Sequence, residues 1–303
     1  MAKPTQSKTI KEAVAQAIKY QTFLPDIAIR RVLSRVDFVP FHPKRWRNLF
    51  DEISKSEPDL LKIADIISLD TGMTAAILKI AISSYLDLPY RKPDAKEAVF
   101  LIGLEGVRAL VQAYEALLQR TRIKIRNDLF NAISRHSLAT ALLAREIAKS
   151  HSTSEDWISN AFTAGMLHDV GCLELANNFQ NNYLRALDVS TENRIPLWQA
   201  EGEILGSNHM NITAFLIGLW GFPLNIVEAL AFHHTPQKMK TQNFNLCTVL
   251  HVADYLSNLY NESDITSGFH ELNLDYLERT GCAGLLPMWQ DPVSYTHLRA
   301  HET

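Results

Sequence analysis

The chain has 303 residues, of which 47% are hydrophobic and 21% are charged, so it is long enough for two compact units with ordinary cores. This composition excludes an intrinsically disordered chain. A formal net charge of −3 gives no global electrostatic reason to expect a nucleic acid or an anionic membrane as partner. We therefore expect a soluble globular protein whose function depends on a local site.

Helical periodicity dominates the sequence from one end to the other. Apolar residues recur at spacings of three and four, whereas alternating strand patterns are scarce, so we predict an all-α protein. Prolines, and the segment GFP at 221–223, mark the breaks between helices. In chain order, the predicted helices cover residues 8–21, 25–36, 44–54, 59–69, 73–84, 93–102, 104–119, 126–150, 155–168, 175–187, 195–206, 209–220, 223–233 and 244–260.

The basic stretch at residues 120–126, RTRIKIR, separates a histidine-poor first part from a histidine-rich second part. It is either the solvated start of a helix or a basic lip that meets phosphates near a site. We place a boundary there. The predicted divisions are an N-terminal helix in 1–23, a helical subdomain in 24–125, a second helical subdomain in 126–265 and an extension in 266–303.

The last eleven residues, VSYTHLRAHET at 293–303, are polar and have no helical pattern. This string resembles a translated sequencing adaptor, so we expect it to be non-native and leave His297 and His301 out of the functional argument.

The spacing of the cysteines and the length of the apolar runs indicate the cellular location. Cys172, Cys247 and Cys282 lie far apart without a CxxC spacing, which indicates neither a disulfide framework nor a thiolate zinc site. The polar start of the chain has no apolar signal core, and the longest apolar run, Ile212 to Leu224, is too short to span a bilayer. We expect a cytoplasmic protein with no membrane partner.

Histidines and aspartates in the second part predict a metal site. Imidazole and carboxylate are the ligands of divalent iron, manganese, zinc, cobalt or nickel, and one or two such ions are expected. Most of these residues fall at ends of predicted helices, where several helices can converge, and Gly171 would let the chain leave helical geometry there. The predicted ligands are His136, His168, Asp169, His209, His233, His234 and Asp254.

Each residue taken alone has a simpler explanation. His136 and His209 would serve as ordinary core histidines, and His233-His234 would stabilise a helix C-terminus. Asp254 lies within an apolar helix, where a salt bridge, or His251 one turn earlier, would compensate its charge as well as a metal. The combination of residue types favours the metal.

At these residues the chain resembles the HD superfamily of metal-dependent phosphohydrolases. Their pattern of a histidine, a His-Asp pair and a later aspartate is matched by His136, His168-Asp169 and Asp254. The further histidines match those with which HD-GYP phosphodiesterases hold a second metal. The resemblance implies that Asp169 bridges two ions, with His136, His168 and Asp254 around one and His209, His233 and His234 around the other.

The first part is similar to a narrower family. Segments at 24–28 (LPDIA), 63–70 (IADIISLD), 74–84 (TAAILKIAISS) and 101–108 (LIGLEGVR) look like successive segments of the HDOD family, the HD-related output domains of bacterial signalling. With the second part, the resemblance covers about residues 24–265. It implies a two-part helical bundle whose second part is an HD-type metal-site bundle.

Departures from these families bear on catalysis. HDOD proteins usually have Asp-Pro and Asn-Ser where this chain has Asp70-Thr71 and Ser83-Ser84. These differences affect only the residues that start and end helices, not the chemistry of the site. HD-GYP enzymes carry a lysine where this chain has Cys172, and a GYP segment after the double histidine, where this chain has TPQK at 235–238. A carboxylate for a third metal is replaced by Ala132. These changes weaken the case for cyclic dinucleotide hydrolysis.

Three functions remain open. We favour a bacterial signal-transduction protein that acts on signalling proteins in trans. The alternative is an active phosphohydrolase or phosphodiesterase for a nucleotide or cyclic dinucleotide, with His168 and Asp169 as catalytic metal ligands and Arg135 or Lys149 steadying phosphate. A third interpretation is a hydrogen-bonded polar core without metal.

The predicted helix near the N-terminus has one apolar stripe. It would dock a partner or a second copy of the chain, or pack on its own bundle, so a homodimer is left open.

Overall fold

The computed structural model describes residues 39–84, 94–120, 125–241, 243–260 and 271–290. These residues form helices joined by short loops and include no strand, which confirms the all-α class. The helices predicted at 8–21 and 25–36 lie outside the described residues. None of the described helices combines the length and the apolar character needed to cross a bilayer.

The first part contains α3 (Pro43–Ile53), α4 (Leu60–Ser68), α5 (Thr71–Ser84) and α6 (Ala95–Arg120). Their bounds follow the predicted ones within a few residues. The two helices predicted at 93–102 and 104–119 are the two halves of α6, because Gly103 lies between them with a φ of 67° and kinks the helix. Glycine reaches this backbone region without a steric penalty, which explains the break at this position.

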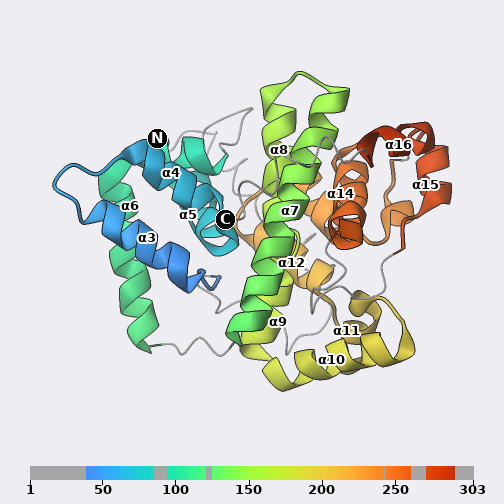
Figure 1. The fold of residues 1–303 in the computed structure, drawn as a ribbon, viewed down its shortest axis with the longest axis horizontal. Helices are drawn as coiled ribbons and strands as arrows, with labels where there is room; N and C mark the ends of the chain where they lie inside the picture. The colour runs from blue at the N-terminus through green and yellow to red at the C-terminus, as the bar shows by residue number, and fades with distance from the viewer. Residues whose placement is uncertain (1–38, 85–93, 121–124, 242, 261–270, 291–303) are drawn as a thin grey trace, which may run out of the picture.

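The second part begins with the long helix α7 (Asn127–His151) and α8 (Glu155–Leu167), which pack against each other in the middle of the molecule (Figure 1). The helices that follow are α9 (Val170–Asn178), α10 (Gln180–Asn193), α11 (Leu197–Leu205), α12 (His209–Leu219), α13 (Leu224–Phe232) and α14 (Leu246–Tyr260). In Figure 1, α3 to α6 lie on one side of α7 and α8, and α14 lies on the other.

One helix prediction in the second part was wrong. A single helix was expected at 175–187, but α9 ends at Asn178 and α10 begins at Gln180, with Phe179 between them at φ −130° and ψ 39°. No glycine or proline marks this break, so local signals missed it. The sequence analysis also missed four short elements, because they are too short to show a periodicity. They are the helices α15 (Leu274–Arg279) and α16 (Leu286–Trp289) and the 3-10 turns Pro236–Lys238 and Ala283–Leu285.

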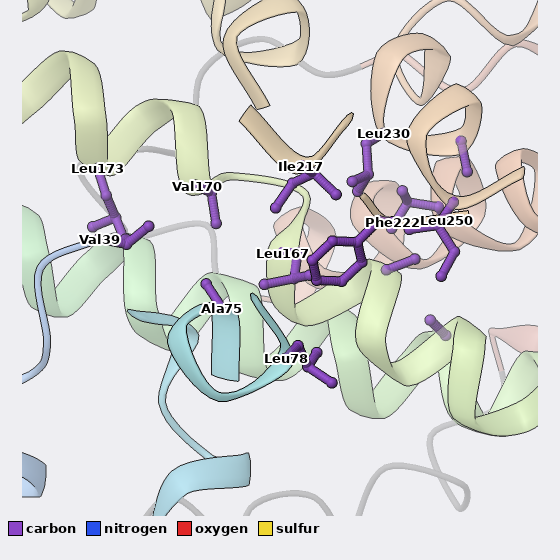
Figure 2. Packing of buried hydrophobic residues seen from close by; sticks show 14 of the residues in the cluster. Val39, Ala75, Leu78, Leu167, Val170, Leu173, Ile217, Phe222, Leu230 and Leu250 are labelled. Atoms are coloured by element: carbon purple, nitrogen blue, oxygen red, sulfur yellow. The ribbon is translucent and has the colours of Figure 1, made fainter. Parts of the chain in front are cut away.

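A continuous apolar core runs through both parts. Ala75 and Leu78 of α5 belong to the same buried cluster as Leu167 of α8 and Val170 of α9, as Figure 2 shows. The predicted boundary near residue 125 falls between α6 and α7, and the division into subdomains stays a prediction. This core fixes the ends of α8 and α9, where the central His-Asp pair lies.

Candidate metal centre

All seven predicted ligands come together in the structure. His136 lies within α7, His168 and Asp169 lie between α8 and α9, and His209 is the first residue of α12. His233 and His234 follow α13, and Asp254 lies within α14. Six of these side chains are buried and His234 is partly buried. Residues that are up to 118 positions apart in the sequence therefore form one cluster.

The first group in the cluster surrounds one position. The Nε2 atoms of His136 and His168 are 3.2 Å apart, and Asp254 Oδ1 lies 3.0 Å from His136 Nε2 and 3.8 Å from His168 Nε2. Asp169 Oδ2 completes the group at 3.6 Å and 3.3 Å from the same two nitrogens. These four side chains present two nitrogens and two oxygens to a common centre.

The second group lies on the other side of Asp169. His209 Nε2 is 3.6 Å from Asp169 Oδ1 and 3.1 Å from His234 Nε2. One ligand atom each from His209, His233 and His234 lies within 4.8 Å of the others. The two oxygens of Asp169 thus face different groups, which is the arrangement that a bridging carboxylate requires.

The imidazole rings are oriented by oxygen acceptors behind them. His168 Nδ1 donates to the Gly165 carbonyl at 2.7 Å, and His233 Nδ1 donates to the Leu230 carbonyl at 2.8 Å. His209 Nδ1 lies 2.7 Å from Glu201 Oε2. A neutral imidazole has one N–H, so an oxygen acceptor at Nδ1 leaves a lone pair on Nε2. In their neutral forms, the three rings therefore direct Nε2 lone pairs into the cluster.

Inside the cluster, burial and the neighbouring titratable side chains together shift the pKa values. Burial opposes the charged form of His168, but Asp169 and Asp254 outweigh it and raise the pKa of that histidine. Burial likewise opposes ionisation of Asp169, yet His168 and His209 hold its pKa well below the usual range. Burial and the neighbouring His168 lower the pKa of His233 to about 3, so its ring is neutral.

A divalent ion fits this set of residues. The Nε2 lone pair of a neutral His168 is repelled by the nearby oxygens of Asp169 and Asp254 unless a proton or a cation lies between them. His233 Nε2 is buried and has no hydrogen-bond partner among the described residues, although an unsatisfied buried acceptor is costly. Nitrogen and carboxylate donors with oriented rings are the usual surroundings of a transition-metal ion.

Glu201 was missed by the sequence analysis. It is fully buried on α11, and its Oε2 accepts hydrogen bonds from both the backbone N–H of His209, at 2.8 Å, and the ring Nδ1–H. A carboxylate behind a metal-binding histidine fixes the ring and its tautomer. The only local signal was an acidic residue on a helix that precedes His209, and such residues are common on exposed helix faces.

His251 does not compensate Asp254 by a hydrogen bond, which was one of the predicted alternatives. Its Nδ1 bonds to the His233 carbonyl at 2.7 Å, and its Nε2 accepts from the Asn273 backbone N–H at 3.0 Å. The amide of Asn258 instead donates to Asp254 Oδ1 at 3.0 Å. His251 therefore supports the loop that carries His233.

Gly171 has a different role from the predicted one. The backbone leaves helical geometry at Asp169, with φ −105° and ψ 17°, whereas Gly171 lies inside the first turn of α9. A Cβ atom at Gly171 would lie 2.2 Å from the His209 carbonyl oxygen. The glycine is needed because α9 and α12 approach so closely there, and this approach places Asp169 beside His209.

A cleft of about 530 Å³ opens over the cluster. His136, Asp169 and Asp254 lie on its inner wall, while Trp198 and Lys238 line other walls. Arg135 and Lys149, the predicted phosphate contacts, are not among its described lining residues, and Lys149 pairs with Glu146 at 2.9 Å. In the basic stretch, Arg126 pairs with Asp128, and residues 121–124 lie outside the described residues.

The model of the HDOD domain family matches residues 39–236. The chain belongs to the HDOD family. Six of the seven clustered ligands fall within the matched residues, and Asp254 lies beyond them. The family assignment thus covers α3 to α13, which include every ligand-bearing element except α14.

A curated relative of the chain is distant in sequence. This chain is 25% identical over 232 residues to an uncharacterised protein of Treponema pallidum (strain Nichols), and the match covers 76% of this chain and 44% of that protein. The chain therefore spans less than half the length of this relative.

Solved structures share the fold. The MmoQ response regulator of Methylococcus capsulatus superposes with a TM-score of 0.63 at 21% identity, over 84% of this chain and 99% of that one. A virulence factor of Campylobacter jejuni superposes with a TM-score of 0.58 at 21% identity, over 85% and 93% of the two chains.

Proposed function

We propose that this HDOD protein is a regulatory component of bacterial signal transduction, that it acts in the cytoplasm on signalling proteins in trans, and that its second part holds a divalent metal centre. The family match supports a regulatory HDOD protein. The fold is shared with a protein named as a response regulator, MmoQ of M. capsulatus.

The observation that carries the metal proposal is the convergence of Nε2 lone pairs on two carboxylates. Oxygen acceptors hold His168, His209 and His233 with Nδ1 protonated, so their Nε2 atoms cannot donate to one another or to the aspartates while the rings are neutral. Bound metal ions would satisfy all of these acceptors. Their ligands would come from α7, the α8–α9 junction, α12, the segment after α13, and α14, so the centre would hold these elements together.

We assign His136, His168 and Asp254 to one ion and His209, His233 and His234 to a second, with Asp169 bridging the two. The separate orientation of the two Asp169 oxygens supports this division. The metal types expected for nitrogen and carboxylate donors are iron, manganese, zinc, cobalt and nickel.

A metal-dependent phosphohydrolase is the second candidate, and the cleft favours it. When bound there, a divalent ion would lower the pKa of a coordinated water and neutralise charge on phosphoryl oxygens. We prefer the regulatory function because a phosphate-binding cleft should be basic. This cleft is not basic, because the positive charge of Lys238 is offset by the negative charges of Glu271 and Asp275 among the described lining residues.

Metal analysis of the purified protein tests the proposal. We expect the wild type to contain one or two equivalents of a divalent ion, and a His168→Ala variant with the same circular dichroism spectrum to contain at least about one half less of it. A metal-free wild type after growth with added iron, manganese or zinc, or equal metal in the variant, would contradict the proposed centre.

Hydrolysis assays separate the two candidate functions. Metal-loaded protein is incubated with a panel of nucleotides and cyclic dinucleotides, beside an Asp169→Ala variant. We expect no turnover above the variant's level. Turnover that disappears in Asp169→Ala would replace the regulatory function with the enzymatic one.

A further inference from the structure

Cys172 lies beside the second group of ligands. It is in the first turn of α9, three residues after Asp169, and only 3% of the residue is exposed. Its Sγ, a carboxylate oxygen of Asp169 and a ring nitrogen of His209 all lie within 4.8 Å of one another. The residue also lines the cleft.

The backbone packing explains why a cysteine 37 positions before His209 can reach it. Gly171 is so close to His209 that even a methyl group would collide with the His209 carbonyl at 2.2 Å. The next residue, Cys172, is therefore held next to the start of α12. Sequence spacing could not reveal this, because a thiolate site is normally recognised from pairs of nearby cysteines.

A second observation points to a ligand at the same place. His233 Nε2 is buried without a hydrogen-bond partner among the described residues, and His233 belongs with His234 to the group that shares His209. His209 and Asp169 therefore each belong to a group with Cys172 and to a group with the unsatisfied His233.

We propose that Cys172 Sγ is a ligand of the ion held by His209 and Asp169, and that it makes this position prefer a thiophilic divalent ion such as Zn²⁺ or Co²⁺ over Mn²⁺ or Mg²⁺. This inference rests on the proposed metal centre. On binding, a metal–sulfur bond forms, the S–H bond breaks and its proton goes to solvent, while neither sulfur nor metal changes oxidation state. The position formed by His136, His168 and Asp254 has only nitrogen and oxygen donors, so the two positions differ in softness.

Cobalt spectroscopy of the full chain tests the assignment. Metal is removed by dialysis against a chelator, and Co²⁺ is added while absorption is recorded. We expect visible d–d bands from bound Co²⁺ and a near-ultraviolet band from thiolate-to-cobalt charge transfer. Cys172→Ser should keep the visible bands and lose the near-ultraviolet band.

Cys282→Ser is the matched control. Cys282 is also buried, but it belongs to none of the described ligand groups, and serine can keep its hydrogen bond to the Thr280 carbonyl. This variant should retain both sets of bands. A charge-transfer band that persists in Cys172→Ser, or visible bands without charge transfer in the wild type, would overturn the cysteine assignment and leave the metal centre standing. Failure of the wild type to bind Co²⁺ would overturn both.

A measurement on the wild type covers the case in which Cys172→Ser does not fold. X-ray absorption at the zinc edge of Zn²⁺-loaded protein should show a sulfur scatterer at about 2.3 Å, the usual zinc–thiolate distance. A shell of nitrogen and oxygen alone would refute the proposal. In a folded Cys172→Ser variant, we expect Zn²⁺ affinity to fall at least ~10-fold and Mn²⁺ affinity to change less than ~3-fold, because thiolate favours the softer ion.

Discussion

Asp70 in the first part and Asp254 in the second are equally buried, each with 2% of its surface exposed, but their surroundings differ. Asp70 accepts hydrogen bonds from the backbone N–H groups of His42 and Met73, both at 2.9 Å. Asp254 accepts from the Asn258 side chain and also faces imidazole nitrogens of His136, His168 and His234.

This difference teaches how to interpret a buried carboxylate. Burial raises the pKa of Asp70, and its two backbone hydrogen bonds oppose that effect, so the group is satisfied by the fold itself. Around Asp169, His168 and His209 have oxygen acceptors at Nδ1, so their neutral rings turn Nε2 lone pairs towards the carboxylate. The chemical type of the groups around a buried carboxylate, rather than its burial, therefore identifies the candidate metal centre.

The largest expected effect comes from Gly171→Ala. Its Cβ would meet His209 backbone atoms at 2.2–2.9 Å, so we expect a loss of about 3 kcal/mol or more in the free energy of unfolding, together with loss of metal. Denaturant unfolding and metal analysis of the same preparation measure both quantities.

Gly72 provides the matched change in the first part. A Cβ there would lie 2.3 Å from the Pro40 carbonyl oxygen, so Gly72→Ala should also destabilise the protein but keep its metal content. Gly202→Ala, where a Cβ meets nothing within 4 Å, should be neutral or slightly stabilising. Equal metal content in the Gly171→Ala and Gly72→Ala variants would contradict the placement of the metal centre in the second part.

Chelation should distinguish the two buried aspartates. For an ion present at 100 times its dissociation constant, binding adds about 2.7 kcal/mol of stability, and a chelator should remove that amount from the wild type. Asp254→Asn should lose the stabilisation from the ion at its own position, so its unfolding temperature should fall less on chelation than that of the wild type. Asp70→Asn should be less stable than the wild type but remain sensitive to chelator. Thermal unfolding by circular dichroism is the measurement, and a chelator effect in Asp254→Asn as large as that in the wild type would contradict the assignment.

Glu201→Gln should weaken metal binding without removing a ligand. An amide at this position accepts less strongly from His209 Nδ1–H, and loss of such a supporting carboxylate typically costs about 10–100-fold in metal affinity. Calorimetric titration with Zn²⁺ gives the affinity. Glu203→Gln, two residues later on the exposed side of α11, is the control and should bind as the wild type does. Unchanged affinity in Glu201→Gln would assign this carboxylate to packing alone.

The smallest effect is expected at Glu52 in the first part, where an ion pair makes stability depend on pH. Hydrogen bonds from Lys55 and Lys62, at 2.8 and 2.9 Å, lower the pKa of Glu52 to about 2. A depressed pKa stabilises the folded state above about pH 4.5, and this contribution is lost as the pH falls towards 2.

Glu52→Gln should therefore melt below the wild type at pH 7, and the difference should shrink as the pH approaches 2. The same difference should persist in chelator, since the pair lies in the first part. Glu57→Gln, an exposed neighbour, serves as the control and should show little change. A difference that stays constant from pH 7 to pH 2.5 would contradict the ion-pair explanation.

Local signals predicted most of the described helices because apolar spacing and caps act over a few residues. Asn208, for example, accepts a hydrogen bond from the Asn211 backbone N–H at 3.0 Å and so starts α12 at the ligand His209. The division at Phe179 was not predictable in this way, since neither glycine nor proline marks it. Tertiary packing of α9 and α10 overrides a periodicity that continues through the break.

The sequence by itself determined the helical class, the family and the seven residue types that form the candidate centre, because periodicity and the order of histidines and aspartates are properties of the linear chain. Only the tertiary structure decided which atoms face one another. The position of Glu201 behind His209 depends on the contact of α11 with α12. The two directions of the Asp169 oxygens and the position of Cys172 depend on the contact of α9 with α12. Contacts between distant helices are set by packing, and no local pattern records them.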